Sequence, residues 1–256
     1  MEGQECSGKT VAWLTTTLSN EGSRLDVPMD HFSHSSDKSF SIPIIRMLAK
    51  NASATGDRHI FLNPGGPGAS GVGFLRESAY DLNKLIGEGF HLLSFDPRGV
   101  SGSIPKAVCY PSNSERAAAF ASTPWDLKFQ AGEMYTRAEN KVKACEDMMG
   151  EHGKYISTLQ IAADMNSILD AIGQQQIWNY TRSDIYAMFP ERVSRMVLDG
   201  VSNLDEWCGI DAEYYPSARG SAVSTLSVEE EDLLSSLHAL ATKDVFLVRS
   251  QVVSHT

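Results

Sequence analysis

Short apolar runs that stop abruptly at glycine, proline, asparagine or aspartate constrain the fold of this chain more than any other feature. Four such runs occupy residues 58–62, 91–95, 176–180 and 193–198. Runs this short and this apolar are typical of strands buried on both faces of a parallel sheet. Because parallel strands require crossover connections, helices are expected between them, and the sequence predicts an α/β fold.

The segments between these runs fit that expectation. Apolar residues recur at helical spacing over residues 74–86 and 157–172, and glycines at 87 and 173 end both patterns. Residues 125–149 also have a helical pattern, whereas the prolines in 101–125 favour a loop. Residues 11–50 predict two or three antiparallel strands, and Pro43 favours an edge strand or a bulge there.

Composition excludes several classes of protein. The 256 residues include 22 Lys plus Arg and 32 Asp plus Glu, a net charge of −10, without a local basic cluster, so we expect no nucleic-acid partner. The longest apolar runs, such as 245–248, are far shorter than the roughly 20 residues that span a bilayer, so we expect no membrane partner. The N-terminus is acidic and has no signal-peptide pattern.

Cysteine and histidine usage gives no metal-binding pattern. The four cysteines are too few for a disulfide scaffold and lack zinc-ligand spacing: Cys6, Cys109, Cys145 and Cys208. His31 and His34 lie three residues apart without a cluster of further ligands, and we interpret them as solvent-exposed loop residues. We expect no metal and no cofactor.

Four motifs occur in one order along the chain. They are Asn-Pro-Gly-Gly-Pro-Gly-Ala-Ser-Gly (63–71), Ser-Phe-Asp-Pro-Arg-Gly-Val-Ser-Gly-Ser (94–103), Tyr-Ile-Ser-Thr with Ala-Ala-Asp-Met (155–165) and Met-Phe-Pro-Glu-Arg-Val-Ser-Arg-Met-Val-Leu-Asp-Gly-Val (188–201). Together they resemble the α/β-hydrolase family of fungal and actinomycete tripeptidyl and prolyl aminopeptidases, the peptidase S33 group. The resemblance covers about residues 24–207. It implies a mostly parallel sheet with flanking helices, here lacking the C-terminal strands, and serine-dependent acyl transfer on peptide or ester substrates.

By this resemblance, Gly65 and Gly66 line an oxyanion hole. Backbone N–H groups must point at the oxygen that becomes charged when a carbonyl is attacked, and glycine lets the backbone adopt positive φ and approach the substrate. The prolines at 64 and 67 stiffen the loop. The alternative is a tight strand-to-helix turn without a ligand. For Asp96-Pro97-Arg98-Gly99 we favour a structural role, with Arg98 paired to a carboxylate.

The nucleophile of such an enzyme is not evident. Serine hydrolases of this fold carry it on a Gly-x-Ser-x-Gly elbow between a strand and a helix, and this chain contains no such motif. Only residues 181–185 fill the corresponding gap, too few for an elbow and a helix of about 11 residues. Ser183 is a weak candidate, because Thr181 and Ile185 on either side do not tolerate positive φ cheaply.

The catalytic acid and histidine should follow the nucleophile in the chain. The resemblance fades after Trp207, which divides the chain into an α/β-hydrolase core (1–207) and a divergent remnant of a lid or cap (208–256). His238 lies in an amphipathic stretch and His255 near the chain end, and neither fits the role of base.

Two readings of function remain open. In the first, the chain is a hydrolase of peptide or ester substrates whose catalysis is impaired. In the second, it is a non-catalytic truncated paralogue or a mis-spliced product that acts, if at all, as a binding protein. Secreted relatives suggest a Cys109–Cys145 disulfide, and two free thiols are equally compatible with the sequence. Nothing in the sequence specifies an oligomeric state.

Overall fold

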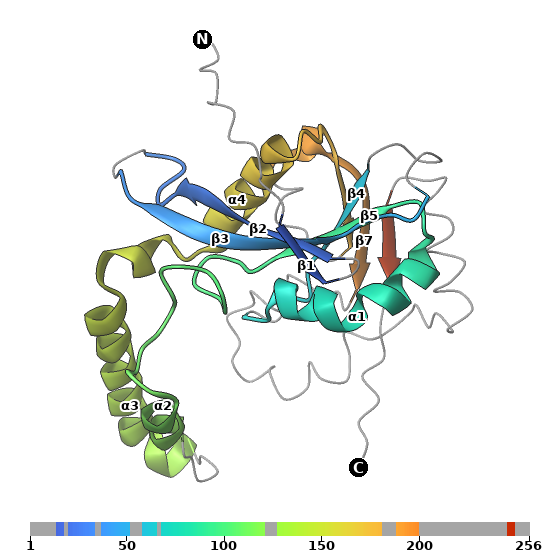
Figure 1. Ribbon diagram of the computed structural model, residues 1–256. Helices are drawn as coiled ribbons and strands as arrows, with labels where there is room; N and C mark the ends of the chain where they lie inside the picture. The colour runs from blue at the N-terminus through green and yellow to red at the C-terminus, as the bar shows by residue number, and fades with distance from the viewer. Residues whose placement is uncertain are drawn as a thin grey trace, which may run out of the picture.

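The fold is built on one mixed β-sheet (Figure 1). A computed structural model describes residues 14–17, 20–33, 37–51, 58–65, 68–120, 127–180, 188–199 and 245–248. Eight strands of this part of the chain form the sheet in the order β1-β2-β3-β5-β4-β6-β7-β8. They are β1 (Leu14–Thr17), β2 (Asn20–Pro28), β3 (Ser39–Met47), β4 (His59–Leu62), β5 (His91–Phe95), β6 (Ile177–Tyr180), β7 (Val193–Asp199) and β8 (Val245–Val248).

The sheet combines an antiparallel and a parallel half. β1, β2, β3 and β5 pair antiparallel in that order, and β5, β4, β6, β7 and β8 continue the sheet as parallel neighbours. The apolar runs identified in the sequence therefore form the central parallel strands. All residues of β4 and β5 are buried, as expected for strands covered on both faces.

Helices cover the two faces of the sheet (Figure 1). Helix α1 (Gly71–Ile86) packs on one face and α4 (Thr158–Ala171) on the other. Because side chains alternate along a strand, Phe61 joins the core under α4, whereas its neighbour Leu62 joins the core under α1. Ser70 and Ser157 cap the N-termini of α1 and α4 by accepting backbone N–H groups.

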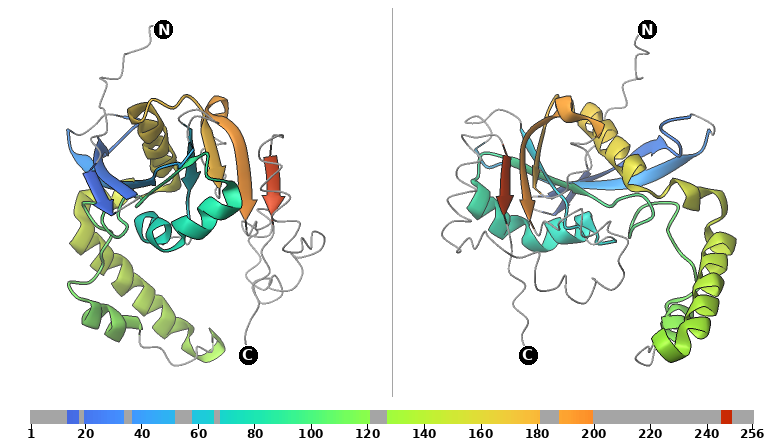
Figure 2. Two further views of the ribbon diagram at one scale, coloured as in Figure 1. Left: turned by 45° about the vertical axis from the view of Figure 1, so that its right-hand side comes forward. Right: turned by 180° about the vertical axis from the view of Figure 1, so that it is seen from behind.

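A second region extends away from the sheet (Figure 2). We define the arm as residues 107–149, which contain α2 (Asn113–Phe120) and α3 (Leu127–Met149); the 3-10 helix η2 (Gly150–Tyr155) connects it to α4. A disulfide joins Cys109 to Cys145 across the arm, which settles the choice between the two cysteine states that the sequence left open. Large apolar side chains of α3 are exposed, among them Tyr135 at 66% and Val142 at 67%.

Two sequence expectations differ from the structure, and one strand was not predicted. Residues 113–120 form helix α2 rather than part of a loop, and β8 was not predicted as a strand. Pro43 lies in an interior strand, not at an edge, because β3 is flanked by β2 and β5. The proline is tolerated because the pairing of β3 with β5 begins at Ile44, so no donor from Pro43 is needed in that ladder.

Of the predicted second domain, 208–256, only β8 belongs to the described residues. His238 and His255 lie outside them. Among the described helices, none combines the length and the apolar character that crossing a bilayer requires.

Candidate active site at the carboxyl edge of the sheet

The ends of β4 and β6 lie side by side. The parallel register pairs Leu62 with Tyr180, the last residues of these two strands. Both strands therefore end at the same edge of the sheet, and β5 ends beside β4 on the other side. In open α/β sheets the crevice at the carboxyl ends of the strands is where ligands bind. This edge is the candidate site.

The glycine-rich turn after β4 begins with an internal hydrogen bond. Asn63 is 4% exposed, and its Oδ1 accepts the N–H of Gly65 at 2.9 Å. Gly65 has a φ of +79°, a conformation that residues with a Cβ rarely adopt, and a Cβ there would meet no atom within 4 Å. Backbone conformation, not crowding, therefore requires glycine at position 65. The Asn63 Nδ2 group is buried and has no partner among the described residues.

Asp96 fastens the neighbouring loops. Its Oδ1 accepts the Ser70 hydroxyl at 2.6 Å and the Val72 N–H at 3.1 Å, and its Oδ2 accepts the Gly102 N–H at 2.9 Å. The carboxylate lies at the N-terminus of α1, where the helix dipole favours negative charge. Since both oxygens are engaged by donors, Asp96 holds the loop after β5 against α1. The structural role expected for 96–99 agrees with this geometry.

Helix α1 approaches β5 very closely at its first residue. A Cβ at Gly71 would lie 2.1 Å from the Phe95 carbonyl oxygen and 2.4 Å from Ser94 Oγ. The Ser94 hydroxyl itself donates to the Leu62 carbonyl at 2.6 Å and so connects β5 to the end of β4. The close approach fixes the start of α1 relative to β5, and the Ser94 hydrogen bond fixes β5 relative to the end of β4.

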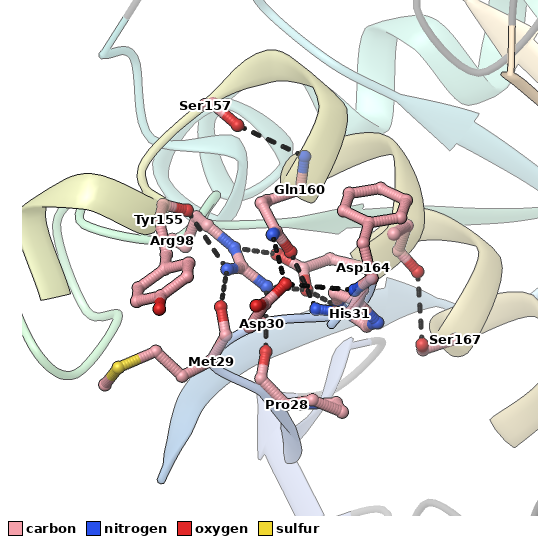
Figure 3. Close-up of polar contacts among 12 residues, drawn as sticks. Pro28, Met29, Asp30, His31, Arg98, Tyr155, Ser157, Gln160, Asp164 and Ser167 are labelled. Carbon is pink, nitrogen blue, oxygen red and sulfur yellow. Dashed lines mark hydrogen bonds and ion pairs between the residues drawn. The ribbon is translucent and has the colours of Figure 1, made fainter. Parts of the chain in front are cut away.

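A buried ion pair lies beside this edge (Figure 3). Arg98 follows β5 and is 0% exposed, and its Nε and Nη2 donate to the two oxygens of Asp164 at 2.7 and 2.5 Å. The guanidinium also donates to the carbonyls of Met29, Tyr155 and Pro28. The bidentate pair joins the loop after β5 to helix α4. The predicted Arg–carboxylate pair thus exists, with a partner that the sequence did not identify.

His31 belongs to the same network (Figure 3). Its side chain is only 11% exposed, and its Nε2 lies 2.8 Å from Asp164 Oδ1. Gln160 connects the backbone N–H of His31 to Asp30 through its amide. The interpretation of His31 as a solvent-exposed loop residue was therefore wrong. The local sequence around His31 does not identify Asp164 as its partner, because the two residues are 133 positions apart in the chain.

The sequence-predicted site residues are only partly within the described structure. Gly65 lies in the turn after β4, whereas Gly66 and Ser183 lie outside the described residues, as does His34. The residues that sequence reasoning missed are Ser70, Asn63 and Asp164, each of which holds a neighbouring loop or helix. Ser70 directly precedes the start of α1, the position that an N-cap residue takes, so its capping role could have been predicted from the sequence. Among the described residues, no group of three metal-ligating side chains gathers.

Comparison with known proteins finds relatives of peptidase type. Serine protease Hip1 of Mycobacterium tuberculosis (strain ATCC 25618 / H37Rv) is 31% identical over 215 residues, which are 75% of this chain and 40% of that protein. Tripeptidyl aminopeptidase of Streptomyces lividans is 28% identical over 180 residues, 62% of this chain and 32% of that protein. The matched region thus spans less than half the length of these relatives. No family model matches the chain.

Solved structures with a similar arrangement include an alpha/beta hydrolase candidate from Nostoc sp PCC 7120. It has a TM-score of 0.41 and 13% identity, with 77% of this chain and 49% of that chain covered. A hydrolase from Pseudomonas aeruginosa PA01 has a TM-score of 0.36 and 12% identity, with 86% of this chain and 73% of that chain covered. With its mixed sheet, its helices on both faces and its sequence relatives, the chain belongs to the α/β-hydrolase family and has relatives of peptidase type.

Proposed function

We propose that this chain has the scaffold and the carbonyl-binding turn of a serine peptidase, and that it does not complete catalysis by itself. The proposed substrates of this site are peptides, in line with the relatives named serine protease and tripeptidyl aminopeptidase, together with the esters that the sequence motifs also imply. One observation carries the proposal, the length of the connection between β6 and β7.

That connection consists of residues 181–192, of which Pro190–Arg192 form the 3-10 helix η3. Crossovers between parallel strands need about a dozen residues or more, so this one is near the lower limit before any catalytic elbow is added. A nucleophile elbow requires a sharp turn that continues into a helix. We infer from length alone that residues 181–189, which lie between β6 and η3, are too few for both an elbow and a helix of about 11 residues.

The turn after β4 would supply the oxyanion donors. An effective donor lies about 2.7–3.1 Å from the position of the oxyanion. The N–H of Gly65 already donates to Asn63, so it could serve only by sharing that bond or leaving it. The N–H of Gly66 is therefore the better candidate, and Gly65 then acts mainly by setting the conformation of the turn.

Labelling with a fluorophosphonate probe tests the proposed impairment. The purified chain should show no labelling above that of the heat-denatured chain, while the tripeptidyl aminopeptidase of Streptomyces lividans, as positive control, is labelled under the same conditions. Ser183→Ala should give the same result as the unaltered chain. Labelling that disappears in Ser183→Ala would overturn the impairment and make Ser183 the nucleophile.

Peptide binding tests the scaffold separately. Trialanine amide should shift the backbone amide resonances of Asn63, Gly65 and Ser70, and Gly65→Ala should abolish these shifts because alanine disfavours the φ of +79°. Trialanine amide that shifts none of these resonances would contradict a carbonyl-binding role. Sequencing the transcript across codons 178–190 addresses the mis-spliced alternative, since recovery of Gly-x-Ser-x-Gly there would restore a complete enzyme.

A further inference from the structure

A hollow on the arm lies beside the Cys109–Cys145 disulfide, apart from the carboxyl edge of the sheet. It has a volume of about 530 Å³ and is lined by residues 107–113 together with Arg116 of α2 and Lys141 of α3. Small-molecule sites commonly have volumes of about 300–1,000 Å³. We propose that this hollow binds an organic carboxylate with an apolar or aromatic body.

The charges around the hollow favour an anion. Arg116 and Lys141 come from different helices and both line it, and no acidic side chain is among the lining residues. The chain as a whole has a net charge of −10, whereas the lining of this hollow carries two cations. An Arg fork matches the two oxygens of a carboxylate, and a Lys adds a point charge.

The nearest carboxylate on α2 is already engaged. Glu115 Oε2 accepts the Ser112 N–H and the Ser112 hydroxyl, both at 3.1 Å, and so closes the first turn of α2. This reciprocal cap holds Glu115 at the start of the helix. Adjacent side chains of a helix do not face each other, so Glu115, held at Ser112, does not lie against Arg116.

The other residues that line the hollow favour a ligand with an apolar body. Val108, Tyr110 and Pro111 contribute aliphatic and aromatic surface, and Ser112 and Asn113 contribute polar groups. A site with a few polar groups that orient a ligand against apolar walls is the usual composition of a small-molecule pocket. Inorganic anions would use only the cationic part of it.

The disulfide assembles the hollow. Cys109 is one of the lining residues, and its bond to Cys145 connects segment 107–113 to α3, which carries Lys141. At its other end the segment is held by the Ala107 N–H, which donates to the Gly99 carbonyl at 2.8 Å. Reduction of the disulfide releases one wall from the other, so ligand binding should depend on the oxidised state.

Titration with N-acetylphenylalanine, followed by backbone amide resonances, tests the site. The carboxylate should shift the resonances of Val108, Tyr110 and Asn113, and N-acetylphenylalaninamide, its neutral counterpart, should bind at least ten-fold more weakly. The double substitution Arg116→Ala/Lys141→Ala should weaken binding of the acid at least ten-fold. Both side chains are exposed, so these variants should fold normally, and circular dichroism is the measurement that checks this.

Matched variants separate the site from general charge effects. Lys143→Ala removes an exposed cation of α3 that pairs with Asp147 and does not line the hollow, and it should leave affinity unchanged. The double substitution Cys109→Ser/Cys145→Ser should abolish the resonance shifts. Equal binding of acid and amide, equal weakening by Lys143→Ala, or no shift at all would overturn the carboxylate site. Unchanged binding without the disulfide would overturn its role in assembly.

Discussion

The sheet with its two covering helices and the α2–α3 arm are stabilised in different ways. In the sheet region Arg98 and Asp164 are fully buried and paired with each other, and the carbonyls around Arg98 accept its remaining N–H groups. In the arm, Phe129 is 79% exposed, and the described ion pairs, such as Arg137 with Glu133, connect neighbouring turns of one helix. Many buried contacts stabilise the first region, and one covalent bond with local helical interactions stabilises the second.

The difference predicts where substitutions are costly. In the sheet region, removal of a single buried group leaves its partners without compensation. In the arm, we expect most side-chain substitutions to leave stability nearly unchanged, whereas removal of the disulfide should lower it. The four predictions below test this contrast.

Asp164→Ala should have the largest effect. It leaves the Arg98 guanidinium buried without its counter-charge, a change that typically costs about 3–5 kcal/mol. The measurement is the urea midpoint of unfolding. Asp170→Asn is the control on the same helix, because Asp170 is 49% exposed where it pairs with Arg192 and should lose less than about 1 kcal/mol. Equal losses in the two variants would show that burial does not distinguish these pairs.

The double substitution Cys109→Ser/Cys145→Ser should cause the second largest loss of stability. The bond closes a loop with a sequence separation of 36, and such bonds typically contribute about 2–4 kcal/mol. The loss should be local, so hydrogen exchange of α3 amides should accelerate while the urea midpoint of the sheet region stays nearly constant. If both regions lose stability equally, the arm and the sheet unfold as one cooperative unit.

Two glycine substitutions should act in opposite directions. Gly71→Ala places a Cβ 2.1 Å from the Phe95 carbonyl oxygen and should destabilise the sheet region by about 1–3 kcal/mol. Gly132→Ala lies within α3, where a Cβ meets no atom within 4 Å, and should stabilise the arm by up to about 1 kcal/mol. Thermal melting and hydrogen exchange measure the two changes. Destabilisation by Gly132→Ala would contradict the open surroundings of the arm helix.

Glu151→Gln should have the smallest effect. Glu151 of η2 pairs with Lys38 at 2.5 Å on the protein surface; the hydrogen bond from Lys38 lowers the pKa of Glu151, and the same bond raises the pKa of Lys38. The contribution of Glu151 is present above its unfolded pKa and disappears as pH falls through its lowered folded pKa. The melting temperatures of the two proteins should therefore differ slightly at neutral pH and converge in acid. A difference that persists in acid would exclude this ion pair as its source.

Local sequence patterns predicted much of the fold. The four apolar runs form β4 to β7, and the caps at Ser157 and Gly87 lie where the helical patterns begin and end. Helix α2 could have been identified as well, because Ser112 and Glu115 have capping-box spacing. The prolines of this region favoured a loop instead, although Pro111 precedes the helix, where it does not interrupt the hydrogen bonds.

The candidate site was less predictable because its contacts join distant parts of the chain. Arg98 was expected to pair with a carboxylate, but nothing near it identifies Asp164, 66 residues later. Asn63 has the appearance of an ordinary turn residue until its buried amide is placed beside Gly65. Tertiary contacts of this kind depend on how strands and helices pack, which local periodicity does not encode.

The position of β6 has a consequence for engineering. The strand is paired on both sides, with β4 and with β7, and these ladders are complete at Tyr180. A longer segment grafted directly behind that residue would therefore leave the strands in register, and each doubling of a flexible loop costs only about 0.6 kcal/mol. A nucleophile elbow and its helix could therefore be inserted after Tyr180 without changing the pairing of the strands that are already present.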